Sequence, residues 1–348
     1  MKLWNIFLFC SFFSVANAQP TNVLFIGNSY THMNYLFKIY QNLASSKGKK
    51  VIVDTLAVSG SSLKGHALRE NTYKKMKASN WDYAFIQGYS HELAKDSATI
   101  VAQTIPYAQQ LIDSLKKYNP CINIFYYMTW GYAEGFKDSI PDDSYELMQE
   151  RIRKGYLQLS EATGKLPVAP VGMVWKHVRE KYPELNLYTS DNSHPSPYGS
   201  YIAACTFYTA IYKESPVDGA FPKQIDATIA KNIQKATAGY VLSYYRNYNL
   251  DRDIDDDKEF VKSNFNVKEK WLSISISNYY STAEQYFWEF GDGNTSNKKN
   301  PKHYYSKPGI YSIILHTRKG CNWFKMKKTI TVSDKIKHAS QTKKSQKN

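Results

Sequence analysis

The stretch Val23-Leu24-Phe25-Ile26-Gly27-Asn28-Ser29-Tyr30-Thr31 decides the fold. Its continuous apolar run is typical of a strand buried on both faces of a parallel sheet. A small polar turn follows the run and leads into residues with helical spacing. Ser29 is therefore expected at the carboxyl end of a strand and beside a helix N-terminus, where unpaired N–H groups favour negative charge. That position suits a nucleophile, but small polar residues also cap helices, so a catalytic role for Ser29 requires a base elsewhere.

The same strand-to-helix pattern recurs further along the chain. Apolar runs at residues 51–58, 83–86, 122–128 and 168–171 predict further strands, and helical periodicity follows the first strand and separates most of the others. Alternating strands and helices imply right-handed crossovers, which predict a three-layer α/β/α, flavodoxin-like parallel sheet. Ligands bind at the carboxyl ends of such strands, so the turns at Ser29, Gly60 and Gln87 are expected to share one rim.

A base is available in Asp191-Asn192-Ser193-His194-Pro195, which lies in a proline-rich loop before a predicted helix. A histidine before a helix is often a surface or capping residue. Here a carboxylate three residues earlier can hold the imidazole Nδ1–H, fix the tautomer and leave Nε2 free to take a proton from a serine. Ser29, His194 and Asp191 are the predicted catalytic residues.

These motifs resemble those of the SGNH (GDSL-like) hydrolase superfamily over residues 22–249. Gly27-Asn28-Ser29-Tyr30 is similar to the nucleophile block, Gly60 falls where the second block supplies a backbone N–H, and residues 191–195 resemble the Asp-x-x-His-Pro block. The resemblance implies two-step acyl transfer by a Ser-His-Asp triad, with the oxyanion held by the N–H groups of Ser29 and Gly60. It implies no cofactor, and the sequence offers no metal-ligand spacing.

The third block departs from the common Gly-x-Asn pattern. The chain has Gln87-Gly88-Tyr89-Ser90-His91, which looks closer to the Gln-Gly-Glu form of sialate and xylan acetylesterase-like members. Gln87 is therefore the predicted side-chain donor to the oxyanion, with Ser90 as the alternative. The competing interpretation is that Gln87 only ends a strand in solvent.

Four further side chains are candidates for substrate contact because they follow predicted strands or flank the motif turns. Trp130 and Trp175 could stack on a sugar ring or fill the core. The others are His32 and His91.

The N-terminal sequence and the cysteines indicate where the protein is expected to act. Residues 1–18 read as a cleaved signal peptide, so the protein is expected to be secreted or periplasmic, with no membrane span. The predicted hydrolase domain covers residues 19–250. Removal of the signal leaves Cys121, Cys205 and Cys321, an odd number, interpreted as buried free thiols.

Residues 251–257 form an acidic run interpreted as a linker, and residues 258–332 change to alternating strand patterns. Trp288-Glu289-Phe290-Gly291-Asp292-Gly293 and the tyrosines near residue 305 resemble a PKD domain, which implies an immunoglobulin-like β-sandwich. Its predicted role is a spacer or a glycan contact. Residues 333–348 read as a basic disordered tail. The formal net charge of +15, concentrated in the C-terminal third, favours anionic glycans or general solubility over nucleic acid.

Together these features predict an exported carbohydrate O-acetylesterase that acts on an acylated polysaccharide or another small ester. Two alternatives remain at this point: a lipid or aryl esterase with the same triad, and a non-catalytic glycan-binding or adhesion protein with a degenerate site.

Overall fold

The computed structural model describes residues 20–251, 265–278 and 283–334, which divide into one compact unit before the first gap and another after it. The predicted signal peptide, nearly all of the acidic linker and all but the first two residues of the predicted tail lie outside the described residues. No helix in the described ranges is both long and apolar enough to cross a membrane.

A five-stranded parallel sheet forms the centre of the first unit, with the strand order β2-β1-β3-β4-β5. The residues of β1 from Val23 to Ile26 are almost completely buried, as expected for a strand covered on both faces. This order confirms the predicted flavodoxin-like sheet. The strands are β1 (Thr21–Gly27), β2 (Val51–Ala57), β3 (Tyr83–Ile86), β4 (Asn123–Tyr127) and β5 (Val168–Ala169).

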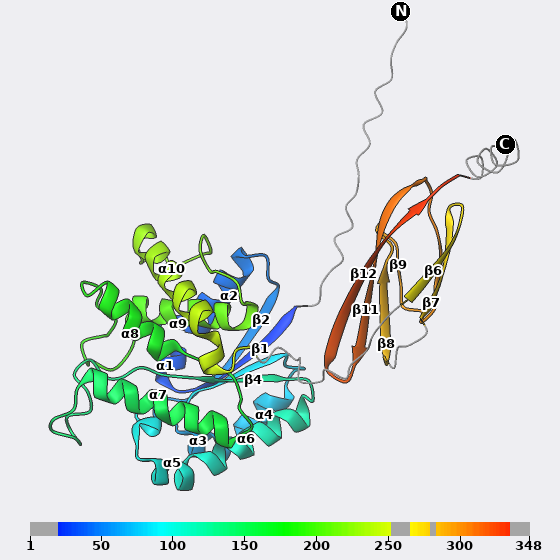
Figure 1. The fold of residues 1–348 in the computed structure, drawn as a ribbon. Coiled ribbons are helices and arrows are strands. Elements are labelled where there is room, and N and C mark those ends of the chain that lie inside the picture. The colour runs from blue at the N-terminus through cyan, green and yellow to red at the C-terminus, as the bar shows by residue number, and fades with distance from the viewer. Residues whose placement is uncertain (1–19, 252–264, 279–282, 335–348) are drawn as a thin grey trace, which may run out of the picture. The chain divides into compact units, whose positions relative to one another are not determined.

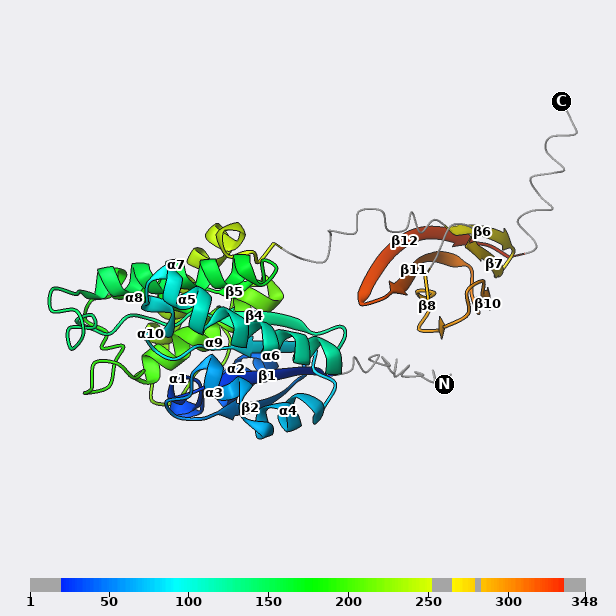
Figure 2. The same ribbon diagram turned by 90° about the horizontal axis from the view of Figure 1, so that it is seen from below.

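Helices cover both faces of this sheet, which confirms the predicted three layers. Figure 1 shows α2, α8, α9 and α10 on one face and α3 to α7 on the other. In Figure 2, α7 and α10 lie toward the β5 edge, and α2 and α4 lie toward the β2 edge. The helices are α1 (Ser29–His32), α2 (Leu36–Ser46), α3 (Leu63–Ala67), α4 (Glu70–Lys77), α5 (Ser97–Gln103), α6 (Ile105–Tyr118), α7 (Tyr145–Ala162), α8 (Val171–Lys181), α9 (Pro197–Tyr212) and α10 (Ala227–Tyr244), with 3-10 turns η1 (Met33–Tyr35), η2 (Glu92–Ala94) and η3 (Tyr245–Tyr248).

The segment after the first strand is interrupted where the sequence predicts one helix from Met33 to Ala44. Asn34 and Tyr35 both have φ of 54°, in the left-handed region, and they separate α1 from α2. Such backbone is costly unless its surroundings fix it. The Asn34 side-chain amide donates hydrogen bonds to the Pro195 carbonyl and the Ser200 hydroxyl, each at 2.9 Å. The break therefore joins the segment after Ser29 to the loop that carries His194.

The second unit is a sandwich of two antiparallel sheets, β10-β7-β6 and β12-β11-β8-β9. The side chains of Trp288 and Tyr305 are fully buried in its core; the Trp288 Nε1–H donates to the Lys298 carbonyl at 2.8 Å, and the Tyr305 hydroxyl donates to the Phe290 carbonyl at 2.9 Å. The predicted immunoglobulin-like β-sandwich is thus confirmed. Its strands are β6 (Phe265–Lys270), β7 (Ser273–Asn278), β8 (Gln285–Glu289), β9 (Thr295–Ser296), β10 (Lys302–Tyr304), β11 (Gly309–Lys319) and β12 (Asn322–Val332).

The cysteines correct one prediction from the sequence. Cys205 is a free, buried thiol on α9, as expected. Cys121 and Cys321 are both exposed and both disulfide-bonded, so the interpretation of these two as buried free thiols is wrong. The odd count showed that one thiol would stay unpaired, but spacing along the chain does not reveal which one.

Candidate active site

Ser29 lies at the junction of β1 and α1, where the sequence places it. Asn28 caps α1, because its side-chain oxygen accepts a hydrogen bond from the Tyr30 N–H at 3.1 Å. Ser29 is the first residue of the helix, so its own N–H has no intrahelical acceptor. The turn thus presents both a hydroxyl and a backbone donor at the carboxyl edge of the sheet.

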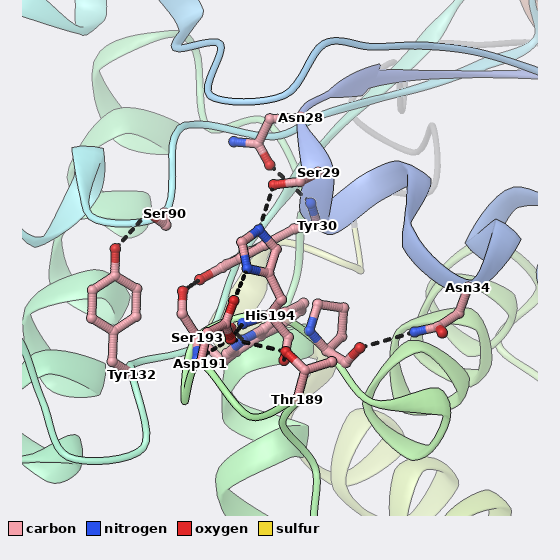
Figure 3. A network of polar contacts seen from close by, with 12 residues as sticks. Asn28, Ser29, Tyr30, Asn34, Ser90, Tyr132, Thr189, Asp191, Ser193 and His194 are labelled. Atoms are coloured by element: carbon pink, nitrogen blue, oxygen red, sulfur yellow. Dashed lines mark hydrogen bonds and ion pairs between the residues drawn. The ribbon is translucent and has the colours of Figure 1, made fainter.

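His194 and Asp191 lie more than 160 residues after Ser29 in the chain, but the fold brings their side chains next to it. Their loop precedes α9, and its ends are joined by a β-bridge between Tyr188 and Pro195. His194 Nε2 lies 2.9 Å from Ser29 Oγ, and His194 Nδ1 lies 2.5 Å from Asp191 Oδ2. Figure 3 shows the three side chains in line, with the imidazole between the hydroxyl and the carboxylate. The structure therefore brings together the three residues predicted as a triad.

The Asp191 carboxylate is held by several donors. Its Oδ1 accepts hydrogen bonds from the backbone N–H groups of Ser193 and His194, at 2.9 and 2.8 Å, and from the Thr189 hydroxyl at 2.9 Å. Burial alone would raise the pKa of Asp191, but these bonds and the one from the His194 ring outweigh it and hold the pKa well below its usual range. The Asp191 carboxylate is therefore charged at neutral pH.

Ser29 opens into a cavity of about 500 Å³. Gly60 lies on its wall with φ of 69°, and its N–H has no hydrogen-bond partner within the described residues. The backbone N–H groups of Gly60 and of Ser29, at the N-terminus of α1, therefore fit the predicted pair of oxyanion donors. The cavity is lined by Asn28, Ser29, Tyr30, Ser59, Gly60, Tyr89, Ser90, Tyr132, Ser193 and His194.

Gln87 does not occupy the predicted position beside this cavity. Its side chain is fully buried, and its two amide hydrogens are donated to Asn28 Oδ1 at 2.8 Å and to the Gly88 carbonyl at 2.6 Å. Its Oε1 accepts from the Asn28 N–H at 3.0 Å and from the Thr31 hydroxyl at 2.7 Å. No donor is left for an oxyanion, which corrects the expected role. Neither does Gln87 end its strand in solvent, because the amide braces the turn that carries Ser29.

Replacing Gln87 with methionine tests this bracing role. Methionine has a similar volume but leaves the buried polar groups of Asn28 and Thr31 without partners, at a cost of about 2–4 kcal/mol in the free energy of unfolding. For a unit of this size the melting temperature should fall by roughly 5–15 °C. The exposed Gln224, changed to methionine, is the matched control and should melt like the wild type. If Gln87→Met melts normally but loses about a hundredfold in turnover, the glutamine acts on the oxyanion directly.

Ser90, the alternative donor, does line the cavity. Its hydroxyl lies 2.8 Å from the Tyr132 hydroxyl, and a dashed line joins the two side chains in Figure 3. The Tyr30 hydroxyl, which also lines the cavity, lies 2.5 Å from Ser193 Oγ. Sequence reasoning missed Tyr30, Tyr132 and Ser193 as site residues, although Tyr30 and Ser193 each lie next to a predicted catalytic residue in the chain.

The structure contradicts the predicted substrate contacts of the two tryptophans. Trp130 and Trp175 are fully buried and stacked on each other with ring centroids 4.1 Å apart. The Trp130 Nε1–H donates to the Ser193 carbonyl at 2.9 Å, so this ring supports the loop that carries Asp191 and His194. Both residues belong to the hydrophobic core of the first unit.

The two histidines lie near the cavity but do not line it. His32 Nε2 is 3.0 Å from Ser59 Oγ at an exposed position. His91 stacks on Phe136 at 4.5 Å, and burial together with the charge of Lys95 lowers its pKa. Their predicted contact with substrate stays a prediction.

Glu92 is a site-supporting residue that the sequence did not single out. Its buried Oε2 accepts from the Leu63 N–H at 3.2 Å and from the Tyr89 N–H at 2.7 Å. These donors belong to the segments that follow β2 and β3, the segments that carry Gly60 and Ser90. A single carboxylate therefore fixes the spacing between two walls of the cavity.

The buried carboxyl group of Glu92 should make the stability of the fold depend on pH. Burial raises its pKa above the ordinary value of 4.5, against the opposing backbone hydrogen bonds. The folded state then binds more protons than the unfolded state between the two pKa values, so stability is lost as the pH rises through that window. Glu92→Gln keeps an acceptor for both N–H groups and removes the charge. Its melting temperature relative to the wild type should rise with pH above about 4.5; a constant difference would contradict this origin.

The two units define the class of protein: a flavodoxin-like α/β unit followed by a β-sandwich of two antiparallel sheets. Residues 267–333 match the family model of the PKD domain. A solved DUF4886 family protein from Bacteroides uniformis is similar to the first unit, with 21% identity and a TM-score of 0.55, over 64% of this chain and 95% of that one. A protein from Slackia heliotrinireducens assigned to the SGNH hydrolases is 23% identical, with a TM-score of 0.43, over 54% of this chain and 97% of that one. The acetyl xylan esterase AlAXEase is 15% identical, with a TM-score of 0.44, over 55% of this chain and 99% of that one.

Among curated proteins the chain is similar to two collagenases of Bacillus cereus. ColQ1 is 24% identical over 273 residues, which cover 71% of this chain, and ColA is 28% identical over 120 residues, which cover 28% of it. The chain spans only 24% and 12% of the lengths of these relatives.

Proposed function

We propose that this protein is a carboxylic ester hydrolase that removes acetyl groups from a polysaccharide. The observation that carries the proposal is the aligned set of Ser29, His194 and Asp191, with distances of 2.9 and 2.5 Å, at the edge of a cavity. In such an arrangement His194 Nε2 takes the hydroxyl proton as Ser29 Oγ attacks the ester carbonyl. The charged Asp191 stabilises the imidazolium that forms.

The oxyanion of the tetrahedral intermediate is held by the N–H groups of Ser29 and Gly60, and the Ser90 hydroxyl is the remaining side-chain candidate. Collapse of the intermediate passes the proton from His194 Nε2 to the departing sugar hydroxyl and leaves an acyl group on Ser29. Water then attacks that acyl group with His194 as base, which releases acetate and restores the serine. No step requires a group other than these side chains, the backbone and water.

The residues that line the cavity favour a polar substrate with a small acyl group. Its side chains carry hydroxyl, phenol, amide and imidazole groups, and none of them is aliphatic. Hydroxyl-bearing sugars find hydrogen-bond partners in such a site, whereas a long acyl chain finds no aliphatic side chain to pack against. This composition disfavours a long-chain lipid ester as the substrate. The intact Ser29–His194–Asp191 alignment likewise disfavours a degenerate, purely binding site.

Export from the cytoplasm is part of the proposal. Disulfide bonds at Cys121 and Cys321 are typical of oxidising compartments, which agrees with the signal peptide predicted from the sequence. A secreted or periplasmic enzyme would meet polysaccharides directly. We assign to the PKD domain the role of a spacer or a glycan contact.

A series of p-nitrophenyl esters from acetate to octanoate tests the acyl preference. We expect kcat/KM to be highest for acetate and to fall by at least about tenfold toward octanoate, because the cavity has no aliphatic side chains for the longer chain to pack against. Acetate release from acetylated polysaccharides, with Ser29→Ala as control, then tests the sugar part of the proposal. Activity that rises with chain length would favour the lipid esterase instead.

A further inference from the structure

A second cavity adjoins the one that contains Ser29. It has a volume of about 470 Å³, within the range of small-ligand sites, and Tyr89 lines both cavities. We call it the lysine pocket. It is lined by Ser62, Lys64, Tyr89, His91, Glu92, Lys95, Ala102, Gln103, Thr104 and Tyr107. A polymer whose acetylated sugar occupies the first cavity can therefore place a neighbouring sugar in the second.

The lysine pocket carries two ammonium groups. Lys64 lies on α3 and Lys95 directly follows η2, both exposed, and neither forms an ion pair with a carboxylate of the described residues. The only carboxylate in the lining is Glu92, whose Oε2 already accepts two backbone N–H groups. With His91 neutral, two positive charges and one negative charge leave the pocket with a net charge of +1.

Aromatic rings complete the pocket. Tyr89 and Tyr107 are partly exposed on its walls, and the Lys64 ammonium lies 5.4 Å from the centroid of the Tyr107 ring. A ring face beside a cation suits a sugar that offers C–H groups on one side and an anionic substituent on another. The exposed Gln103 adds a side-chain amide that can hydrogen-bond its hydroxyls.

We propose that the lysine pocket binds the carboxylate of a uronic acid next to the acetylated sugar, so that the preferred substrate is an acetylated polyuronide. A single carboxylate for each sugar matches the net charge of the pocket. This inference rests on the proposed function for its catalytic part, but the binding step is independent of turnover.

Acetylated homogalacturonan prepared at low and at high methyl esterification tests the substrate part, because methylation neutralises the carboxylates and leaves the acetyl groups in place. We expect kcat/KM for acetate release to be about three- to tenfold higher on the low-ester polymer, mainly through KM, and the difference to shrink as ionic strength rises. Equal release from both polymers would overturn the inference and leave the esterase proposal standing.

A double variant, Lys64→Ala with Lys95→Ala, tests the residues. The matched control is Lys116→Ala with Lys117→Ala, which removes the same charge from the last turn of α6. This turn lies about 15 Å along the helix axis from Tyr107. The first variant should lower the ratio of low-ester to high-ester activity toward one, whereas the control should keep the wild-type ratio. The same change in both variants would show that only net charge matters and would overturn the assignment.

Binding without turnover separates this inference from the proposed function. In affinity electrophoresis with polygalacturonate in the gel, the Ser29→Ala protein should be retarded, and adding the Lys64 and Lys95 substitutions should reduce the retardation more than the Lys116 and Lys117 pair does. Retardation in a protein that hydrolyses no ester would support the pocket and refute the esterase. Retardation that is equal in the two lysine variants would refute the pocket, whatever the activity.

Discussion

The Ser29→Ala protein is expected to lose at least about ten-thousandfold in kcat/KM for acetate release and to stop reacting with a fluorophosphonate probe. The physical reason is that Ser29 Oγ is the atom that His194 Nε2 approaches at 2.9 Å, and alanine removes the nucleophile while it leaves the turn in place. Asn28 still caps α1, and the Gln87 bonds do not involve the Ser29 side chain. Stability should therefore change little, and a melting curve provides that control.

Two outcomes would refute this assignment. Labelling that persists in the Ser29→Ala protein would place the reactive serine elsewhere in the chain. Acetate release that survives within about tenfold would show that water attacks the ester without a covalent intermediate on Ser29. A Ser59→Ala variant, which changes another hydroxyl of the same cavity wall, is the matched comparison and should retain labelling.

Most of the first unit could be predicted from the sequence because its signals are local. The buried run at residues 23–26 and the alternation of strands with helices determine the sheet, and chirality then limits its topology. The three residues of the predicted triad follow from the same logic, because a turn at a strand end and a loop before a helix both reach the carboxyl edge of the sheet.

The sequence does not reveal which way a side chain points after its strand ends, and the wrong predictions for the site come from this. Trp130 and Gln87 each follow a strand, as Ser29 does. The Trp130 side chain is nevertheless buried in the core, and the Gln87 side chain points into the turn that carries Ser29. Residue type does not separate these orientations, since both side chains have polar groups that bond equally well to protein or to substrate. The break at Asn34 and Tyr35 was missed for a related reason: hydrogen bonds to Pro195 and Ser200, far away in the chain, stabilise it.

Asp191→Asn should lower kcat on the order of ten-thousandfold while the fold stays intact. An asparagine can keep its carbonyl oxygen at the Oδ1 position, where it still accepts the backbone N–H groups of Ser193 and His194. Its amide nitrogen then replaces Oδ2 and donates toward His194 Nδ1. The imidazole must accept there, so its proton moves to Nε2, and the nitrogen that faces Ser29 Oγ can no longer take the hydroxyl proton.

A matched control, Thr189→Val, separates the effect of the imidazole tautomer from the loss of a hydrogen bond to Asp191. Thr189→Val removes only the hydroxyl that donates to Asp191 Oδ1 and leaves the bond between Oδ2 and the imidazole at 2.5 Å. Its kcat should fall by no more than about a hundredfold, because a hydrogen bond to a charged group contributes about 1.5–3 kcal/mol. NMR of the imidazole nitrogens should show the proton on Nδ1 in the wild type and in Thr189→Val, and on Nε2 in Asp191→Asn. If Asp191→Asn keeps the Nδ1 proton and most of its activity, the carboxylate does not orient His194, and the base must be positioned by the loop backbone alone.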